Sequence, residues 1–242
     1  MRIGDLEVGR LGFGAMRLCG PGIWGEPADP ENALRVLRRV VELGVALIDT
    51  ADAYGPEVNE RQIAEALCPY PEGLVIATKG GYTRPGPGQW RPDGRPEHLR
   101  EACEGSLQRL RLERIDVYQL HTPDPDVPLS ESVGTLRELR DEGKVRHVGL
   151  SNVSLSQLDE AERIVPIVSV QNRYNAADRT GEDVIDACEA RGIPFLPWFP
   201  LGAGSLDPSE ALRFLLARSP VILPIPGTSS IEHLEENVRA VL

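Results

Sequence analysis

The stretch LRVLRRVVELGVALID (34–49) joins an amphipathic segment to a short apolar run, and this combination points to the fold class. Leu34, Leu37 and Val41 recur at the spacing that places them on one face of a helix. The run VALID (45–49) is apolar up to its last residue, which is typical of a strand buried on both faces of a parallel sheet. The stretch therefore predicts a helix followed by a buried parallel strand.

The same alternation extends over nearly the whole chain. Apolar runs that predict strands lie at residues 11–16, 45–49, 74–78, 115–120, 145–150, 167–171, 193–198 and 221–225. Eight such runs, separated by segments with helical spacing, favour a closed (β/α)8 barrel, the TIM barrel of the α/β class, over an open doubly wound sheet. The first turn, GFGAMR (12–17), also lacks the third glycine of the GxGxxG motif through which open sheets bind dinucleotides.

Two segments lie outside these repeats. IGDLEVGR (3–10) predicts a short β-hairpin ahead of the first barrel strand, where it would cover the barrel floor. The Gly- and Pro-rich segment TRPGPGQWRPDGRP (83–96) predicts a long irregular loop after the third strand, on the side of the barrel that carries functional loops. Because no linker divides the chain, we expect residues 1–242 to form a single domain.

Charge and composition exclude several classes of function. Lys and Arg number 26 against 37 Asp and Glu, a net charge of −11, and an acidic chain without basic clusters repels nucleic acid. No apolar run approaches the ~20 residues of a membrane span, and the N-terminus lacks a signal-peptide pattern. Neither the cysteines nor the histidines have metal-binding or disulfide spacing: Cys19, Cys68, Cys103, Cys188, His98, His121, His147 and His233. We therefore expect a cytoplasmic protein with reduced thiols and no metal, membrane or nucleic-acid partner.

Two serines are predicted to begin helices. Ser154 with Gln157, and Ser229 with Glu232, match the capping-box spacing. A helix N-terminus presents free backbone N–H groups that favour a phosphate, so Thr228 and Ser229 are candidates for phosphate binding. The alternative for Ser229 is a capping role alone.

Polar side chains stand at the predicted carboxyl ends of most strands. In a TIM barrel these ends and the loops after them build the active site. The residues concerned are Asp49, Lys79, His121, Ser151, Asn152, Gln171, Trp198, Phe199, Gly227, Thr228 and Ser229. A purely structural barrel does not need an aspartate, a lysine and a histidine at one rim, so we expect shifted pKa values there.

Tyr54 follows Asp49 by five residues and is the predicted general acid. Its ordinary pKa near 10 is high for proton donation at neutral pH, and a neighbouring Lys79 ammonium is expected to lower it. Asp49 would hold Lys79 as an ion pair, and His121 would orient a carbonyl oxygen. These groups predict carbonyl reduction, with hydride from a bound cofactor and the proton from Tyr54. The alternative is that Asp49 and Lys79 form only a structural ion pair.

Seven motifs, in this order, resemble those of the aldo-keto reductases. They are LGFGAM (11–16), LIDTADAYG (47–55), ATKGG (77–81), YQLH (118–121), GLSN (149–152), VQNRYN (170–175) and IPGTSS…HLEEN (225–237). The resemblance runs from about residue 4 to residue 240. It implies an NAD(P)H-dependent oxidoreductase that reduces aldehydes or ketones to alcohols.

The resemblance also assigns residues. It implies a catalytic tetrad of Asp49, Tyr54, Lys79 and His121. It places the nicotinamide carboxamide against Ser151, Asn152 and Gln171, with Trp198 stacked on the ring. The remaining cofactor residues that it implies are Gly14, Ala15, Met16, Asp49, Phe199, Pro200, Leu201, Gly202, Gly227, Thr228, Ser229, His233, Glu236 and Asn237. Asn152 and Trp198 each have a simpler alternative, as a turn residue and as a packing residue.

The pattern departs from the family in three places. The segment after strand seven, LGAGSLDPSEALRFLLARSP (201–220), is short where relatives carry a loop over the pyrophosphate, so residues 201–207 would form a reduced version of it. The chain ends at Leu242, where relatives continue into a tail beside the substrate pocket. His233 stands where many relatives place an arginine against the 2′-phosphate, and histidine is a weaker anion partner. NADPH is still the expected cofactor, and this departure keeps NADH as the alternative.

Trp24 and Trp90, together with Tyr54 and His121, are the predicted walls of the substrate pocket, and loop-on-loop packing is the alternative for the two tryptophans. The expected ligand is a small carbonyl compound, and the expected state is a monomer or weak homo-oligomer. A nucleotide-binding sensor with negligible turnover is the alternative function. A truncated chain that folds poorly is the second alternative.

Overall fold

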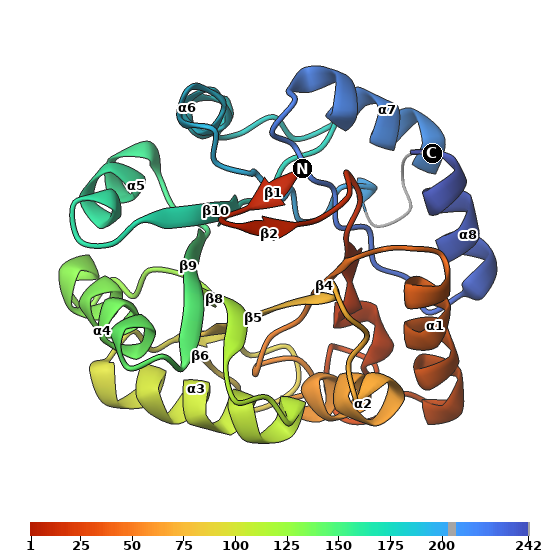
Figure 1. Ribbon diagram of the computed structural model, residues 1–242, viewed down its shortest axis with the longest axis horizontal. Coiled ribbons are helices and arrows are strands. Elements are labelled where there is room, and N and C mark those ends of the chain that lie inside the picture. The colour runs from red at the N-terminus through yellow and green to blue at the C-terminus, as the bar shows by residue number, and fades with distance from the viewer. Residues whose placement is uncertain (203–206, 242) are drawn as a thin grey trace.

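A parallel sheet forms the centre of the computed structural model, which describes residues 1–202 and 207–241. Its six strands follow one another in the order β10-β9-β8-β5-β4-β3 (Figure 1). They are β3 (Phe13–Gly14), β4 (Leu47–Asp49), β5 (Val75–Gly80), β8 (Ile115–Leu120), β9 (Val145–Ser151) and β10 (Ile167–Gln171). Each strand pairs in parallel with its neighbours, with Gly14 beside Asp49 and Asp49 beside Ala77. This register brings the carboxyl ends of the strands to one rim.

Two extended segments, residues 193–198 and 221–225, lie between the two edge strands of the sheet, β10 and β3. The backbone N–H of Leu196 donates to the Val170 carbonyl at 2.7 Å, and that of Leu223 donates to Phe195 at 2.9 Å. The N–H of Gly12 donates to the Pro224 carbonyl at 2.9 Å, which completes the ring of contacts. The arrangement fits a (β/α)8 barrel.

The predicted seventh and eighth strands, 193–198 and 221–225, are isolated bridges instead of regular strands. The physical reason is that prolines interrupt both segments, because a proline has no N–H to donate to a ladder. They stand at residues 194, 197 and 224, and a further proline, Pro226, directly follows the second segment. The sequence therefore marks the right places but overestimates their regularity.

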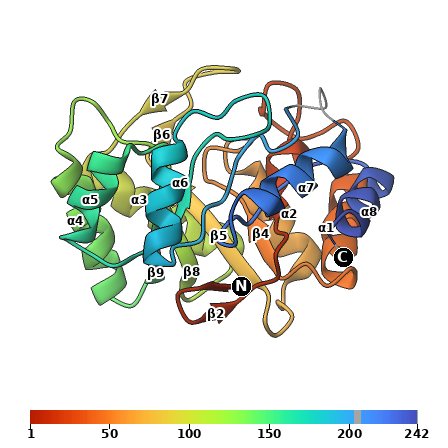
Figure 2. The same ribbon diagram turned by 90° about the horizontal axis from the view of Figure 1, so that it is seen from above.

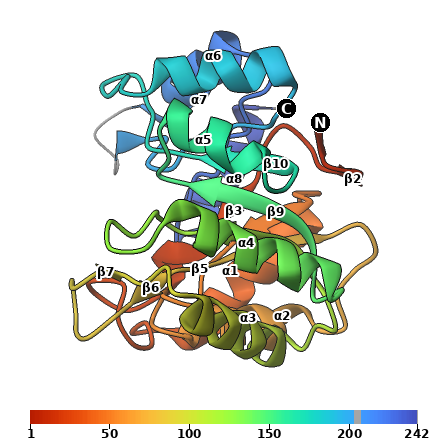
Figure 3. The same cartoon turned by 90° about the vertical axis from the view of Figure 1, so that its left-hand side faces the viewer.

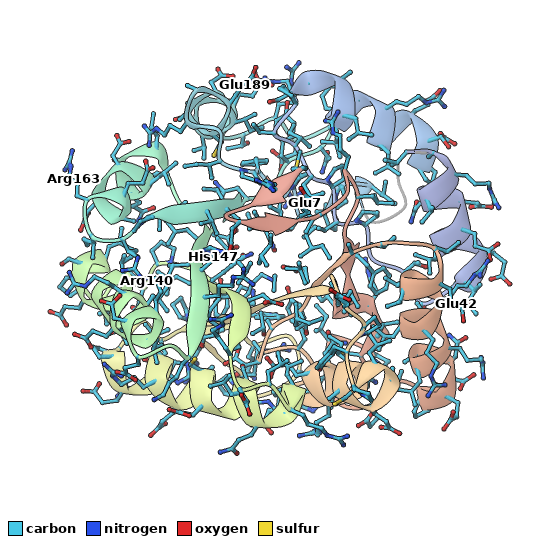
Figure 4. The ribbon with its side chains drawn as sticks, in the orientation of Figure 1. Glu7, Glu42, Arg140, His147, Arg163 and Glu189 are labelled. Carbon is cyan, nitrogen blue, oxygen red and sulfur yellow. The ribbon has the colours of Figure 1, made fainter. Side chains whose placement is uncertain are left out.

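Eight α-helices of the described residues surround the sheet (Figure 1). They are α1 (Pro30–Glu42), α2 (Val58–Leu67), α3 (Pro96–Leu110), α4 (Leu129–Asp141), α5 (Leu155–Glu162), α6 (Glu182–Arg191), α7 (Pro208–Arg218) and α8 (Ile231–Arg239). A short 3-10 helix, η1 (Ala15–Leu18), follows β3. Exposed charged side chains lie on and next to the helices, among them Glu42, Arg163 and Glu189 (Figure 4).

One of the two predicted helix caps is confirmed and the other is wrong. Ser154 and Gln157 form a reciprocal capping box at the start of α5. At α8 the cap is Ser230, whose hydroxyl accepts from the His233 N–H at 3.2 Å, and not Ser229. The helix begins one residue later than predicted because Thr228 Oγ1 already accepts a hydrogen bond from the Ser230 N–H at 3.0 Å, which forms a turn ahead of it.

The N-terminal hairpin is present as predicted and closes the barrel floor. Strands β1 (Arg2–Ile3) and β2 (Leu6–Glu7) pair antiparallel. The buried side chains of Ile3 and Val8 pack into the same cluster as barrel residues such as Val117 and Leu223. Burial of these apolar side chains therefore ties the hairpin to the barrel interior.

A second hairpin lies at the opposite end of the barrel (Figures 2 and 3). Strands β6 (Tyr82–Thr83) and β7 (Arg91–Pro92) pair antiparallel, and all their residues except Tyr82 belong to the segment 83–96, which was expected to be irregular. The Gln89 N–H donates to the Gly86 carbonyl at 3.1 Å and closes the turn. The segment does lie after β5, as predicted, but it is partly ordered as a ladder.

Several other features bear on function. None of the helices in the described ranges is long and apolar enough to cross a bilayer. Within the same ranges, no group of three or more His, Cys, Asp and Glu residues could hold a metal ion. The four cysteines are free thiols, and Cys103 and Cys188 are buried.

Candidate active site

A cavity of about 890 Å³ opens at the carboxyl ends of the strands. Most of the residues predicted from the sequence line it. They are Gly14, Met16, Asp49, Tyr54, Trp90, His121, Ser151, Asn152, Gln171, Trp198, Phe199, Pro200, Leu201, Gly227, Thr228, Ser229, His233, Glu236 and Asn237. Residues as far apart in sequence as Gly14 and Asn237 therefore line the same cavity.

Four predicted residues do not line this cavity. Ala15 is fully buried behind it, and Lys79 is buried beneath Asp49. Trp24 stands behind the wall, while its neighbour Ile23, with a left-handed φ of 56°, takes the lining position. Gly202 borders residues 203–206, where the reduced loop was expected and which lie outside the described residues.

Sequence reasoning missed six lining residues: Arg17, Ile23, Tyr82, Pro208, Ile225 and Pro226. Arg17 had a signal, because it is the last residue of the predicted turn 12–17 and is a cation beside an expected anion site. Tyr82 had a weaker one, as an aromatic residue that directly follows ATKGG (77–81). Nothing in the sequence distinguishes Ile23 from Trp24.

Asp49 and Lys79 form a buried ion pair at the bottom of the cavity. Lys79 Nζ lies 2.7 Å from Asp49 Oδ2 and also donates to the Thr50 carbonyl at 2.8 Å. Gln171 Nε2 donates to the other carboxylate oxygen, Asp49 Oδ1, at 2.8 Å. Burial lowers the pKa of Lys79, and the charge of Asp49 opposes this shift. The pair is thus held from three strand ends.

Tyr54 lies above this pair, in the loop that follows β4. Its side chain is only 6% exposed, and Lys79 Nζ lies 5.3 Å from the centre of its ring. Burial raises the pKa of Tyr54 well above its ordinary value, and the charge of Asp49 raises it further. The expectation that the pKa of Tyr54 lies below its ordinary value is wrong, because the effect of burial exceeds that of the nearby Lys79 ammonium. Tyr54 consequently keeps its proton at neutral pH.

His121 follows β8 and faces Tyr54, with ring centres 5.7 Å apart. Burial lowers the pKa of His121 well below its ordinary value, and the charges of Lys79 and Arg84 lower it further. The imidazole is therefore neutral at pH 7. Its Nδ1 is buried without a hydrogen-bond partner in the described structure, and the residue lines the cavity.

The amide side chains on the other wall divide into two roles. The Asn152 amide is fully engaged: Nδ2 donates to the His121 carbonyl at 3.0 Å, and Oδ1 accepts from Trp198 Nε1 at 2.9 Å. Asn152 also has a left-handed φ of 58°, which suits its role as a turn residue. It fixes the Trp198 ring at the cavity wall.

Gln171 and Ser151 are left with hydrogen-bonding capacity. Gln171 Nε2 donates to Asp49. Gln171 Oε1 accepts no hydrogen bond from the described residues, and Gln171 lines the cavity. The Ser151 oxygen accepts from Asn152 Nδ2 at 3.2 Å, and its hydroxyl hydrogen stays available. One acceptor and one donor beside an aromatic ring match the two polar groups of a carboxamide, so the residues present fit a nicotinamide.

The far end of the cavity suits an anion. The turn at Gly227 approaches β3 so closely that a Cβ atom there would lie 2.4 Å from the Gly14 carbonyl oxygen. Arg17 is exposed, its stem lies along this turn, and its guanidinium has no hydrogen bond or ion pair within the described part of the chain. The N-terminus of α8 adds free N–H groups nearby.

Comparisons with known proteins agree with this geometry. The sequence is 48% identical to an uncharacterized oxidoreductase of Schizosaccharomyces pombe, over 99% of this chain and 84% of the relative. It is 42% identical to pyridoxine 4-dehydrogenase of Escherichia coli, over 98% of this chain and 91% of the relative.

Two solved structures share the fold. The glycerol dehydrogenase of Gluconobacter oxydans has a TM-score of 0.91 and 26% identity, with 100% of this chain and 89% of that chain covered. An aldo-keto reductase of Klebsiella pneumoniae in complex with NADPH has a TM-score of 0.78 and 27% identity, with 97% and 86% covered. The sequence profile of the Aldo/keto reductase family matches residues 10–211. The chain belongs to the aldo/keto reductase family.

Proposed function

We propose that this protein is a reductase that uses NADPH to convert an aldehyde or ketone to the alcohol. The observation that carries the proposal is the buried Asp49–Lys79 pair beneath a protonated Tyr54 and a neutral His121. A nucleotide-binding sensor has no need for these four groups at one end of its cavity. The family membership and the NADPH complex of the Klebsiella relative support the same reaction.

The bound nicotinamide would supply the hydride that the carbonyl carbon receives. Tyr54 donates its hydroxyl proton to the carbonyl oxygen, so that carbon and oxygen together gain the two hydrogens of the alcohol. The Lys79 ammonium, 5.3 Å from the ring centre, stabilises the phenolate that Tyr54 becomes. His121 holds the carbonyl oxygen, and Asp49 fixes the lysine.

The cavity supports one orientation of the cofactor. Gln171 and Ser151 would bind the carboxamide and Trp198 would face the ring, close to Tyr54. Gly14, Met16 and the stretch 199–201 would line the middle of the cofactor. The turn 227–229, with His233, Glu236 and Asn237, would hold the adenosine end.

Arg17 is a candidate to bind the cofactor phosphates. It supplies a permanent positive charge at the end of the cavity where His233 replaces the arginine of many relatives. A guanidinium forms bidentate hydrogen bonds with phosphate, which neutral histidine cannot do. We assign Arg17 to the cofactor phosphates.

The substrate would enter between Tyr54, Tyr82, Trp90 and His121, whose rings line the cavity above the ion pair. Flat apolar walls favour a planar carbonyl compound. Pyridoxal is the first compound to test, because a relative that is 42% identical is a pyridoxine 4-dehydrogenase. We further propose that the single barrel domain acts in the cytoplasm as a monomer or weak homo-oligomer.

The experiment compares wild type with Tyr54→Phe in NADPH oxidation by pyridoxal and by a panel of other aldehydes. We expect turnover to fall by about 10²–10⁴-fold, the usual contribution of a general acid. NADPH binding, followed by quenching of tryptophan fluorescence, should persist in the variant. Near-normal turnover by Tyr54→Phe would contradict the acid role. Tight NADPH binding by wild type with negligible turnover of every carbonyl would favour the sensor.

A further inference from the structure

Arg84 occupies an unusual place in the β6–β7 hairpin, between two tryptophans from different loops. Its guanidinium carbon lies 3.7 Å from the ring centre of Trp90, in the same hairpin, and 5.6 Å from that of Trp24. Both distances are within the range of cation–π contacts. The two tryptophans are predicted walls of the substrate pocket, whereas no role is predicted for Arg84 from the sequence.

The same guanidinium donates hydrogen bonds to backbone carbonyls of three segments. Nη1 donates to Ala53 at 2.7 Å, Nε to Gln89 at 2.9 Å, and Nη2 to Gly22 at 3.3 Å. Ala53 precedes Tyr54 in the loop after β4, Gln89 belongs to the hairpin, and Gly22 belongs to the loop after η1. One side chain therefore joins three loops that approach the cavity from different parts of the chain.

In each of these loops, the residue that follows the one bound by Arg84 lines the cavity. Ile23 follows Gly22, Tyr54 follows Ala53, and Trp90 follows Gln89. Ring contacts then join the lining residues: Tyr54 and Trp90 lie 6.3 Å apart, centre to centre, and Trp90 and His121 lie 6.1 Å apart. The substrate wall is thus a set of loop side chains with Arg84 behind it.

We infer that Arg84 is a positioning residue that holds the three loops of the substrate wall in register. This inference rests on the proposed reductase function for its kinetic consequences. Arg84 does not line the main cavity, so it acts through the residues it holds. An arginine is required because its planar fork places several donors at fixed angles and also stacks on rings.

Loss of Arg84 should affect the substrate and not the cofactor. The residues assigned to the carboxamide, Ser151 and Gln171, belong to strands β9 and β10, and within the described ranges neither forms a hydrogen bond with Arg84. We therefore expect Arg84→Ala to raise the KM for the carbonyl about tenfold, as loss of about 1.4 kcal/mol of positioning would do. kcat should fall as well, because the Ala53 carbonyl adjoins the general acid Tyr54, whereas the Kd for NADPH should stay the same.

Arg91→Ala is the matched control. Arg91 lies on the same hairpin, is exposed, and its guanidinium makes no hydrogen bond or ion pair with the residues that the structure describes. Both variants remove one positive charge, so a general charge effect would appear in both. Arg84→Lys should recover only part of the KM, because an ammonium retains the cation–π contact but not the fork. An unchanged KM in Arg84→Ala, or an equal rise in both alanine variants, would overturn the inference.

A second measurement is independent of turnover. Chymotrypsin cleaves after exposed aromatic residues, and the hairpin contains Tyr82 and Trp90. We expect Arg84→Ala to be cut in the hairpin at least several-fold faster than wild type and Arg91→Ala, while thermal unfolding of all three stays cooperative. If wild type reduces no carbonyl but Arg84→Ala is still cut faster, the proposed function fails and the loop-holding role stands. Equal cleavage of all three proteins would contradict that role even with an active enzyme.

Discussion

Gln171 donates a hydrogen bond from Nε2 to Asp49 Oδ1 at 2.8 Å, although 122 residues separate them in the chain. The bond crosses the barrel from the end of β10 to the end of β4. It joins a residue assigned to the carboxamide of the cofactor to the carboxylate that holds Lys79. Under the proposed function, cofactor binding and proton transfer would share one hydrogen-bonded unit.

Gln171→Leu should weaken both functions of this unit. We expect the Kd for NADPH to rise about tenfold, in line with the ~1–3 kcal/mol that an unmatched buried polar group costs, and kcat to fall as well. Gln119→Leu is the control, because Gln119 is fully buried and both of its amide atoms have no hydrogen-bond partner in the described structure. A loss of kcat alone would contradict the cofactor role. Fluorescence titration and steady-state kinetics provide the two readouts.

The buried ion pair predicts a non-additive effect on stability. Lys79→Met leaves the Asp49 charge without its cation at a fully buried site, which typically costs about 3–5 kcal/mol. Adding Asp49→Asn removes the second charge, so the double variant should regain part of that loss. Urea unfolding measures the free energy of each variant. A double variant less stable than Lys79→Met would show that the charges are not coupled in this way.

His121 makes stability fall in acid. The unfolded chain binds a proton at His121 below its ordinary pKa of 6.5, whereas burial keeps the folded imidazole neutral. Acidification below pH 6.5 therefore favours unfolding, by up to ~1.4 kcal/mol per pH unit from this group. His121→Asn should show a smaller fall in unfolding free energy between pH 7 and pH 5 than wild type. A slope in His121→Asn equal to that of the wild type would contradict this prediction.

Arg17 sets the expected affinity for the cofactor phosphates. Arg17→Ala should raise the Kd for NADPH about tenfold, because charge-assisted hydrogen bonds contribute roughly 1.5–3 kcal/mol. Arg38→Ala removes the same charge from an exposed position on α1, outside the cavity, and should have no effect. A Kd unchanged by Arg17→Ala would contradict the assignment. If Arg17→Ala raises the Kd for NADH as much as the Kd for NADPH, Arg17 contacts the pyrophosphate. If it raises only the Kd for NADPH, Arg17 contacts the 2′-phosphate.

The sequence predicts the rim of the barrel better than its regularity. Asp49, Lys79 and His121 end apolar runs, and a parallel sheet brings such ends together whatever the details of its loops. The segments 193–198 and 221–225 have the same apolar signal, but their prolines remove the donors that a regular ladder needs. Strand placement thus follows from hydropathy, and strand regularity from hydrogen-bonding capacity.

Other features depend on tertiary contacts that no local pattern contains. The pKa of Tyr54 is raised because burial outweighs the charge of Lys79, and burial is known only after folding. Arg84 meets carbonyls of two other loops, 31 and 62 residues away in sequence. The cap of α8 moves from Ser229 to Ser230 because of a turn formed by Thr228. Each of these depends on geometry beyond residue spacing.

The seam where the barrel closes has a consequence for folding. Gly12 and Gly14 donate to the carbonyls of Pro224 and Pro226, at 2.9 and 3.3 Å. Strand β3, the first strand of the barrel, is paired on its second side only after more than 200 further residues have been synthesised. Until then β3 presents an unpaired edge, and an unpaired edge is a template for association with other chains. The seam makes the nascent barrel most prone to aggregation at its oldest strand.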